Sequence, residues 1–173
     1  MNYAEIKFND IANGLGVRVS LFVSGCTHRC KGCFNEVAWD FSYGNPFTKE
    51  TEDKIIASLE NPFISGLSLL GGEPMEPQNQ KALLPFLKRV KELFPNKNIW
   101  CYTGYTLKSP YSIDAQANFE ETPEFLSLID VLVDGKFIEA EYDISLKFRG
   151  SKNQRLIDMN KTRAENKIIC LEI

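Results

Sequence analysis

The sequence lacks long hydrophobic runs, a strong charge excess and all but one histidine. No apolar stretch approaches the roughly 18 residues of a membrane-spanning helix, so no membrane partner is expected. The 20 Lys and Arg against 23 Asp and Glu give a net charge of −3, too mild and of the wrong sign for a protein that binds nucleic acid over its whole surface. The first residues lack the basic and apolar regions of a signal peptide, and we therefore expect a cytoplasmic protein.

Glycine and proline are also scarce, at 11 and 8 of 173 residues. This composition excludes a collagen-like chain and argues against a disordered one. The length corresponds to one domain, and we expect it to span residues 1–173. A chain of this size buries roughly two-thirds of the surface that its unfolded form exposes, so a metal is not needed merely to fold it.

Short apolar segments alternate with helical patterns, which predicts an α/β protein with a mainly parallel sheet. One helix is expected after Thr48, a second through 83–94 that begins or kinks at Pro85, and a third from Thr122 to Ile129. In such sheets the ligand site lies at the carboxyl ends of the strands. Strands are expected at Tyr3–Phe8, Val17–Val23, Leu67–Leu70, Ile99–Thr103, Val131–Val133 and Ile168–Leu171.

Three of the five cysteines, Cys26, Cys30 and Cys33, fall within eight residues directly after an expected strand. An odd count with this lopsided spacing favours a metal or redox centre over disulfides. Thiolates are soft ligands, and three on one short loop can hold a single centre. The neighbouring Arg29 and Lys31 are expected to lower the thiol pKa values.

The number of cysteines leaves two kinds of centre open. Structural zinc needs four protein ligands, and the fourth would be His28, Cys101 or Cys170. A 4Fe–4S cluster normally takes four cysteines, so three would leave one iron open to a small molecule. We expect His28 to be an exposed loop residue, and Cys101 and Cys170 to be core thiols.

A second motif, Gly71-Gly72-Glu73-Pro74, follows another expected strand. Glycines allow the backbone to approach a ligand closely, and a carboxylate suits a cationic group such as an ammonium. Taken alone, this sequence is also an ordinary turn.

Together, the two motifs resemble the radical S-adenosylmethionine superfamily. Further blocks resemble, in order, the activating proteins of anaerobic ribonucleoside-triphosphate reductases, and the match runs from about residue 3 to about residue 157. These blocks are Asp10–Arg18, Leu21–Cys26, Thr103–Tyr105, Val131–Phe137 and Arg149–Gln154.

The resemblance implies an open partial barrel of mainly parallel strands with outer helices. It also implies a 4Fe–4S cluster that reductively cleaves S-adenosylmethionine, releasing a 5′-deoxyadenosyl radical that takes hydrogen from a glycine of the large reductase subunit. The implied partners are that subunit and a low-potential electron donor such as flavodoxin. An activase of another glycyl-radical enzyme, such as pyruvate formate-lyase, is the alternative.

The resemblance also assigns roles to residues of this chain. Cys26, Cys30 and Cys33 would ligate the cluster and carry catalysis. Gly72 and Glu73 would hold the methionine end of S-adenosylmethionine, and Lys136 its carboxylate. Backbone contacts to the adenine would come from Gly32, Cys33 and Phe34, and weaker candidates for the ribose are Thr103 and Asp134.

The segment from Lys147 to Lys167 carries seven basic residues against two acidic ones. Such a run is usually a solvated face. The alternative is a docking surface for an acidic partner, which could include the Arg149–Gln154 block.

Overall fold

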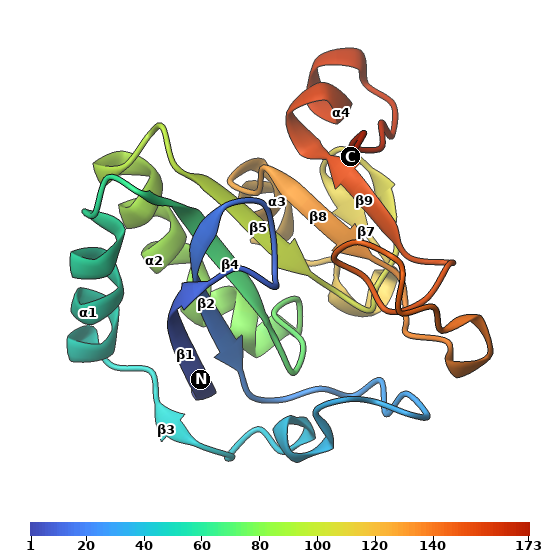
Figure 1. Ribbon diagram of the computed structural model, residues 1–173, viewed down its shortest axis with the longest axis horizontal. Coiled ribbons are helices and arrows are strands. Elements are labelled where there is room, and N and C mark those ends of the chain that lie inside the picture. The colour runs from blue at the N-terminus through green and yellow to red at the C-terminus, as the bar shows by residue number, and fades with distance from the viewer.

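The computed structural model describes all 173 residues, and its centre is a seven-stranded sheet with helices packed on one face (Figure 1). The sheet order is β3-β1-β2-β4-β5-β8-β9. The four central strands β2, β4, β5 and β8 are parallel, and the outer strands pair antiparallel. The expected α/β class with a mainly parallel central sheet is therefore confirmed. The strands are β1 Asn2–Asp10, β2 Val17–Val23, β3 Asn45–Pro46, β4 Ile64–Gly71, β5 Asn98–Tyr102, β8 Val131–Asp134 and β9 Arg155–Asp158.

Alternation along the central strands divides the side chains between two faces. On β5, Ile99 and Cys101 belong to the main hydrophobic core beneath the helices. Trp100 points the other way and packs with Val131 and Leu156 in a smaller cluster. The face beneath the helices is thus fully covered, and the opposite face is buried around Trp100.

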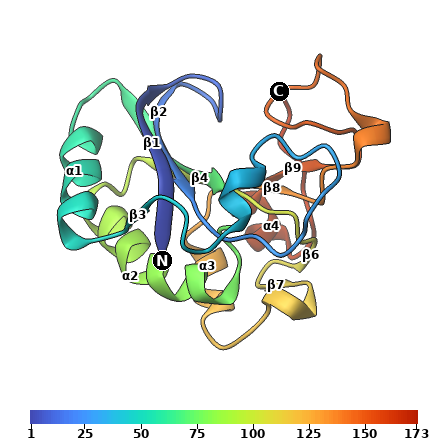
Figure 2. The ribbon, with the colours of Figure 1, turned by 90° about the horizontal axis from the view of Figure 1, so that it is seen from below.

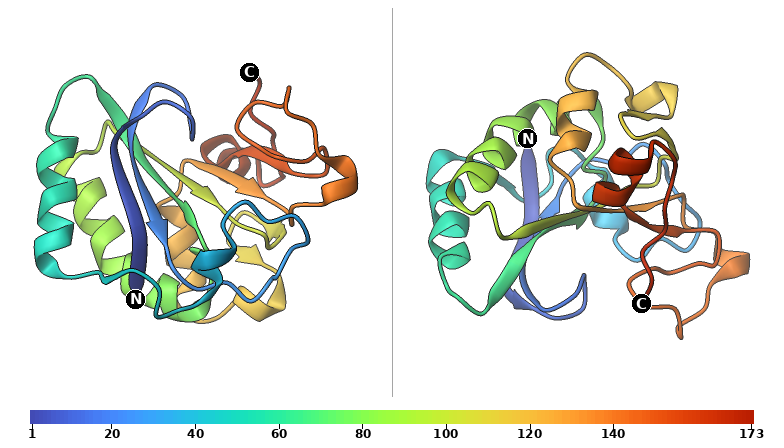
Figure 3. Two further views of the ribbon diagram at one scale, coloured as in Figure 1. Left: turned by 60° about the horizontal axis from the view of Figure 1, so that its bottom comes forward. Right: turned by 90° about the horizontal axis from the view of Figure 1, so that it is seen from above.

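The helices α1, α2 and α3 lie on the same face of the sheet (Figure 3). Thr48 caps α1 as expected, with its Oγ1 accepting from the backbone N–H of Thr51 at 3.3 Å. The expected start near Pro85 is wrong, because α2 begins at Pro77, a favourable first helical position, and runs through Pro85. No helix combines the length and the apolar character needed to cross a lipid bilayer. The helices are α1 Lys49–Leu59, α2 Pro77–Leu93, α3 Thr122–Ser127 and α4 Met159–Glu165.

The expected last strand, Ile168–Leu171, is wrong. The strand paired with β8 is β9, and the later segment forms only an isolated bridge between Cys170 and Ile157. Arg155 on β9 bonds to Asp134 on β8, which fixes β9 at this edge. Short connecting elements complete the chain: the hairpin β6 Leu107–Ser109 with β7 Ser112–Ile113, and the 3₁₀ turns η1 Glu36–Trp39, η2 Ala115–Ala117 and η3 Glu139–Glu141.

Two long loops approach the carboxyl ends of the central strands. Seen from below, the loop after β2, which carries the three clustered cysteines, crosses these strand ends (Figure 2). The loop between β8 and β9 extends from the same region (Figure 1) and contacts the cysteine loop through Phe34 and Phe137. The expected ligand edge of the sheet is therefore covered by two segments of irregular backbone.

Candidate functional site

A cavity of about 550 Å³ lies at the carboxyl ends of the parallel strands. This volume is within the range of about 300–1,000 Å³ that is usual for small-molecule sites. The cavity continues along the sheet face opposite the helices, where Phe22, Leu70, Tyr102 and Val133 form part of its wall. Each of the loops after β2, β4, β5 and β8 contributes to it, so a cavity is present at the edge of the sheet where the ligand site is expected.

The structure brings most of the sequence-predicted site residues to this cavity. Its wall includes Cys26, Cys30, Cys33, Phe34, Gly72, Glu73 and Thr103. Three predicted residues do not line it. Gly32 turns toward Glu139, whose carboxylate oxygen lies 2.9 Å from where a Cβ would stand. Lys136 is exposed, and Asp134 is buried in its bonds to Arg155.

The base of the cysteine loop is fixed by two backbone hydrogen bonds. Gly25 N–H donates to the carbonyl of Ala38 at 2.7 Å, and Cys26 N–H donates to that of Trp39 at 3.2 Å. Gly25 adopts φ +102°, and a Cβ there would lie 2.2 Å from the Phe41 ring. Only glycine satisfies both the backbone angle and this close packing.

Burial dominates the pKa values of Cys26 and Cys30. Burial raises the pKa of Cys26 to about 12, and the nearby carboxylates of Glu73 and Glu76 act in the same direction. Burial also raises the pKa of Cys30, although the charge of Lys136 partly opposes it. The expected lowering of these pKa values is wrong because desolvation exceeds the effect of nearby cations. A bound metal centre would have to displace these protons.

The three thiols fit a cluster better than they fit a single ion. No three Cys, His, Asp or Glu side chains converge closely enough to hold one metal ion. In a 4Fe–4S cluster each thiolate binds a different iron, so convergence on one point is not required. Cys101 is a buried core thiol, as expected, whereas Cys170 is exposed, contrary to expectation, and neither lines the cavity. A fourth thiolate is therefore absent from the cavity wall.

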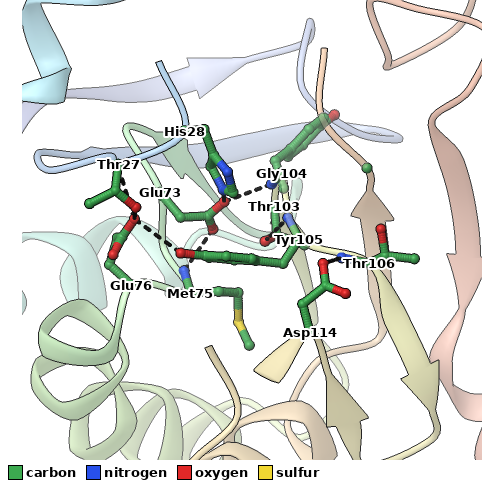
Figure 4. Close-up of polar contacts among 12 residues, drawn as sticks. Thr27, His28, Glu73, Met75, Glu76, Thr103, Gly104, Tyr105, Thr106 and Asp114 are labelled. Carbon is green, nitrogen blue, oxygen red and sulfur yellow. Dashed lines mark hydrogen bonds and ion pairs between the residues drawn. The ribbon is translucent and has the colours of Figure 1, made fainter. Parts of the chain in front are cut away.

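Glu73 lies 1% exposed beside the cysteine loop (Figure 4). Its Oε1 accepts from Nε2 of His28 at 2.8 Å and from the backbone N–H of Gly104 at 2.6 Å, while Oε2 accepts from Met75 N–H at 2.8 Å. The expectation of an exposed His28 is wrong, since its side chain is only 6% exposed. These three bonds leave one acceptor position of Oε2 without a partner.

Glu76 is a second buried carboxylate of the same turn (Figure 4). Its Oε1 accepts from both the backbone N–H and the hydroxyl of Thr27, at 3.0 and 2.7 Å, and from the Tyr105 hydroxyl at 3.3 Å. Burial, together with the charge of Glu76, raises the pKa of Tyr105 to about 12, so this phenol is protonated and donates at neutral pH.

Three polar atoms of the cavity wall are buried without a hydrogen-bond partner. They are the Tyr102 hydroxyl, Nε1 of Trp39 and Nε of Arg149. Arg149 is the only Lys or Arg of the wall, and its guanidinium makes no hydrogen bond or ion pair. Buried donors of this kind are satisfied by a bound ligand or by ordered water, and S-adenosylmethionine carries carboxylate, hydroxyl and ring-nitrogen acceptors.

The sequence identified none of these three donors. The alternation of β5 could have indicated Tyr102, since Cys101 faces the core. The rest of the Arg149–Gln154 block forms a polar turn that holds the residues after β8: the amide of Gln154 donates to the carbonyl of Gly135 at 2.9 Å, and that of Asn153 to the carbonyl of Lys136 at 2.7 Å. Within the basic segment, Arg155 is also committed to an internal ion pair.

Comparison with known proteins identifies relatives of this chain. A family model described as a 4Fe-4S single cluster domain matches residues 12–157. A Vibrio cholerae protein is 48% identical over 157 residues, which cover 89% of this chain and 96% of the relative. An Escherichia coli K12 protein is 44% identical with the same two coverages, and one from Enterobacteria phage T4 is 39% identical over 90% and 93%. All three are named anaerobic ribonucleoside-triphosphate reductase-activating protein.

Proposed function

Because the chain belongs to the family of anaerobic ribonucleoside-triphosphate reductase-activating proteins, we propose that it generates a glycyl radical on such a reductase by cleaving S-adenosylmethionine at a 4Fe–4S cluster. The observation that carries the proposal is one cavity that combines three thiols on the loop after β2 with the Gly-Gly-Glu-Pro turn after β4. When bound, the cluster would supply one electron to S-adenosylmethionine and so release a 5′-deoxyadenosyl radical.

Each part of the cavity has a proposed role. Cys26, Cys30 and Cys33 would ligate three irons. Gly72 and the free acceptor position of Glu73 would receive the amino-acid end of the cofactor. Unpartnered donors on Trp39, Tyr102 and Arg149 support binding of its acceptor groups. Phe34 would contribute backbone contacts to the adenine, together with Gly32 and Cys33, while Lys136 would reach the carboxylate only by reorienting from its exposed position.

The architecture supports the same proposal. We take the parallel centre of the sheet, with helices outside and the cavity on the opposite face, as an open partial barrel formed by one domain over residues 1–173. The cavity supplies no electron donor of its own. A low-potential donor such as flavodoxin, acting in the cytoplasm, completes the proposed reaction.

The protein substrate would enter past an apolar rim on the cysteine loop and the loop between β8 and β9. Phe34 is 75% exposed and Ile144 86% exposed, although both lie at the cavity. The ring centroids of Phe34 and Phe137 are 5.1 Å apart, and those of Phe34 and Tyr142 5.9 Å. Exposed apolar groups around a cavity mouth are typical of protein-binding surfaces.

Ile144→Asp should raise the reductase concentration needed for half-maximal glycyl radical formation by about tenfold, because it places a charge among apolar contacts at the entrance. The radical is quantified by electron paramagnetic resonance over a titration with reductase. Ile173→Asp, at an exposed position outside the cavity wall, is the matched control. Equal effects of the two substitutions would contradict the assignment of the rim.

The whole proposal is tested with the anaerobically reconstituted and reduced protein. Adding S-adenosylmethionine should yield 5′-deoxyadenosine, measured by chromatography, and adding the reductase should yield a glycyl radical spectrum. If pyruvate formate-lyase becomes radicalised and the reductase does not, the partner is wrong. If the protein holds zinc and no 5′-deoxyadenosine forms, the proposed cleavage of S-adenosylmethionine is contradicted.

A further inference from the structure

Two buried carboxylates of the turn after β4 hold the loop that carries the cysteines. We propose that Glu73 and Glu76, with their partners Thr27 and His28, form a clamp that positions the Cys26–Cys30 segment for cluster binding. His28 and Thr27 are then positioning residues, acting through the loop that contains them. The contacts of the clamp are present in the structure, and its role in cluster binding rests on the proposed function.

The clamp contacts consecutive residues of the loop from one side (Figure 4). His28 is joined to Glu73 at 2.8 Å, and Thr27 to Glu76 by two bonds of 3.0 and 2.7 Å. Both partners lie between the first two cysteines in sequence. Since neighbouring residues are fixed, the backbone between Cys26 and Cys30 has little freedom left.

The same carboxylates extend to the loop after β5. Glu73 accepts from Gly104 N–H at 2.6 Å, and Glu76 from the Tyr105 hydroxyl at 3.3 Å. The imidazole of His28 packs against Tyr105 with ring centroids 4.3 Å apart. The clamp therefore joins the loops that follow β2, β4 and β5, three of the four that form the cavity.

Simple stabilisation does not account for this arrangement. A buried carboxylate carries a desolvation cost that apolar packing would avoid. Two occur here within one turn, and every donor to Glu76 is a neutral group. Instead, each carboxylate holds one defined residue of a segment that has no helix or strand of its own, and so fixes the position of that segment.

A link to cofactor binding follows from the atoms involved. Gly72 precedes Glu73 and lines the cavity, and a Cβ on Gly72 would stand 2.6 Å from the carbonyl oxygen of Gly25. The turn proposed for the amino-acid end of the cofactor is thus in direct contact with Gly25, just before the clamped segment, and with Thr27 and His28 within it. Movement of the loop would alter the cluster and the cofactor site together.

The first test measures amide hydrogen exchange of residues 26–30 in the full-length, metal-free protein. His28→Ala should accelerate this exchange by about tenfold, the effect of losing one buried hydrogen bond to a charged group. His28→Gln should restore most of the protection, since the glutamine amide can place a donor near the position of Nε2. Thr27→Val should accelerate exchange, whereas the matched control Thr162→Val, which removes a buried hydroxyl near the C-terminus, should not.

The second test uses the reconstituted protein and records the spectrum of the reduced cluster with and without S-adenosylmethionine. The change that the cofactor causes should be diminished in His28→Ala and recovered in His28→Gln. Unaltered exchange in His28→Ala, failure of His28→Gln to restore it, or equal effects of Thr162→Val would each overturn the clamp. The exchange test is made without cluster or cofactor. Its result therefore remains valid for the clamp even if the wild-type protein cleaves no S-adenosylmethionine and the proposed function fails.

Discussion

Cys30→Ala should abolish formation of 5′-deoxyadenosine, and we expect the same of Cys26→Ala and Cys33→Ala. In the proposed site each thiolate would bind a different iron, so losing any one would leave a cluster with two open irons instead of one. Replacing outer-shell residues of metal sites already costs about 10–100-fold in activity, and losing a ligand should exceed that range. Activity is measured by chromatography of the anaerobic reaction, alongside iron and sulfide content.

Cys101→Ala and Cys170→Ala are the internal controls for this series. Neither thiol lines the cavity, so both variants should keep the full iron content and activity. A structural zinc site would need one of them as a fourth ligand, and that variant would then lose its metal. Loss of metal in either control, or an intact cluster in Cys30→Ala, would contradict our assignment of ligands.

The position of the site could be predicted from sequence because it depends on local patterns. Short apolar runs predicted the central strands, and the motifs around Cys26, Gly72 and Gly104 follow three of them directly. Parallel strands bring their carboxyl ends to one edge, which is sufficient to place these loops at the same edge of the sheet. Which of the loops are neighbours depends on the order of the strands.

His28 shows where such reasoning fails. Its spacing from Cys26 argues against a shared metal site, and the sequence therefore predicts an exposed loop residue. The structure buries it against Glu73, a residue 45 positions away in sequence. A lone histidine carries no periodic signal, and its partner is known only after β2 and β4 are placed next to each other.

The C-terminal part was mispredicted for a related reason. The segment Ile168–Leu171 is more apolar than Arg155–Asp158, yet the latter pairs with β8. Arg155 bonds to the buried Asp134 across the two strands, and leaving that carboxylate unpaired would be costly. The pairing of β9 with β8 thus includes a long-range charge pair that hydrophobic periodicity does not detect.

Arg18 gives the largest expected effect on stability, because it is a fully buried cation without a carboxylate partner. Its Nε donates to the Ser68 hydroxyl at 2.7 Å, and its Nη atoms donate to the carbonyls of Leu15, Leu67 and Asn98 at 3.0, 2.9 and 3.2 Å. Burial lowers its pKa to about 10, so it is still charged at neutral pH.

Arg18→Met should therefore lower the free energy of unfolding by about 3 kcal/mol, since it leaves several buried acceptors without a donor while keeping most of the apolar stem. For a chain of this length, this corresponds to a fall in Tm of about 6–12 °C. Urea denaturation and thermal melting measure the two quantities. Arg18→Lys should recover little, because an ammonium cannot reproduce the planar fork of donors.

Arg89→Met is the matched control, because Arg89 forms ion pairs with Glu52 and Asp53 at the surface, where solvent screens them. Its effect should be clearly smaller than that of Arg18→Met, and equal losses would contradict the argument from burial.

The hydrogen bonds of Arg18 also reach the cavity through Ser68, whose hydroxyl accepts from Arg18 and donates to the carbonyl of Asn13 at 2.6 Å. Asn13 lines the cavity, so the network that stabilises the sheet around Arg18 also fixes the end of the cavity remote from the cysteines.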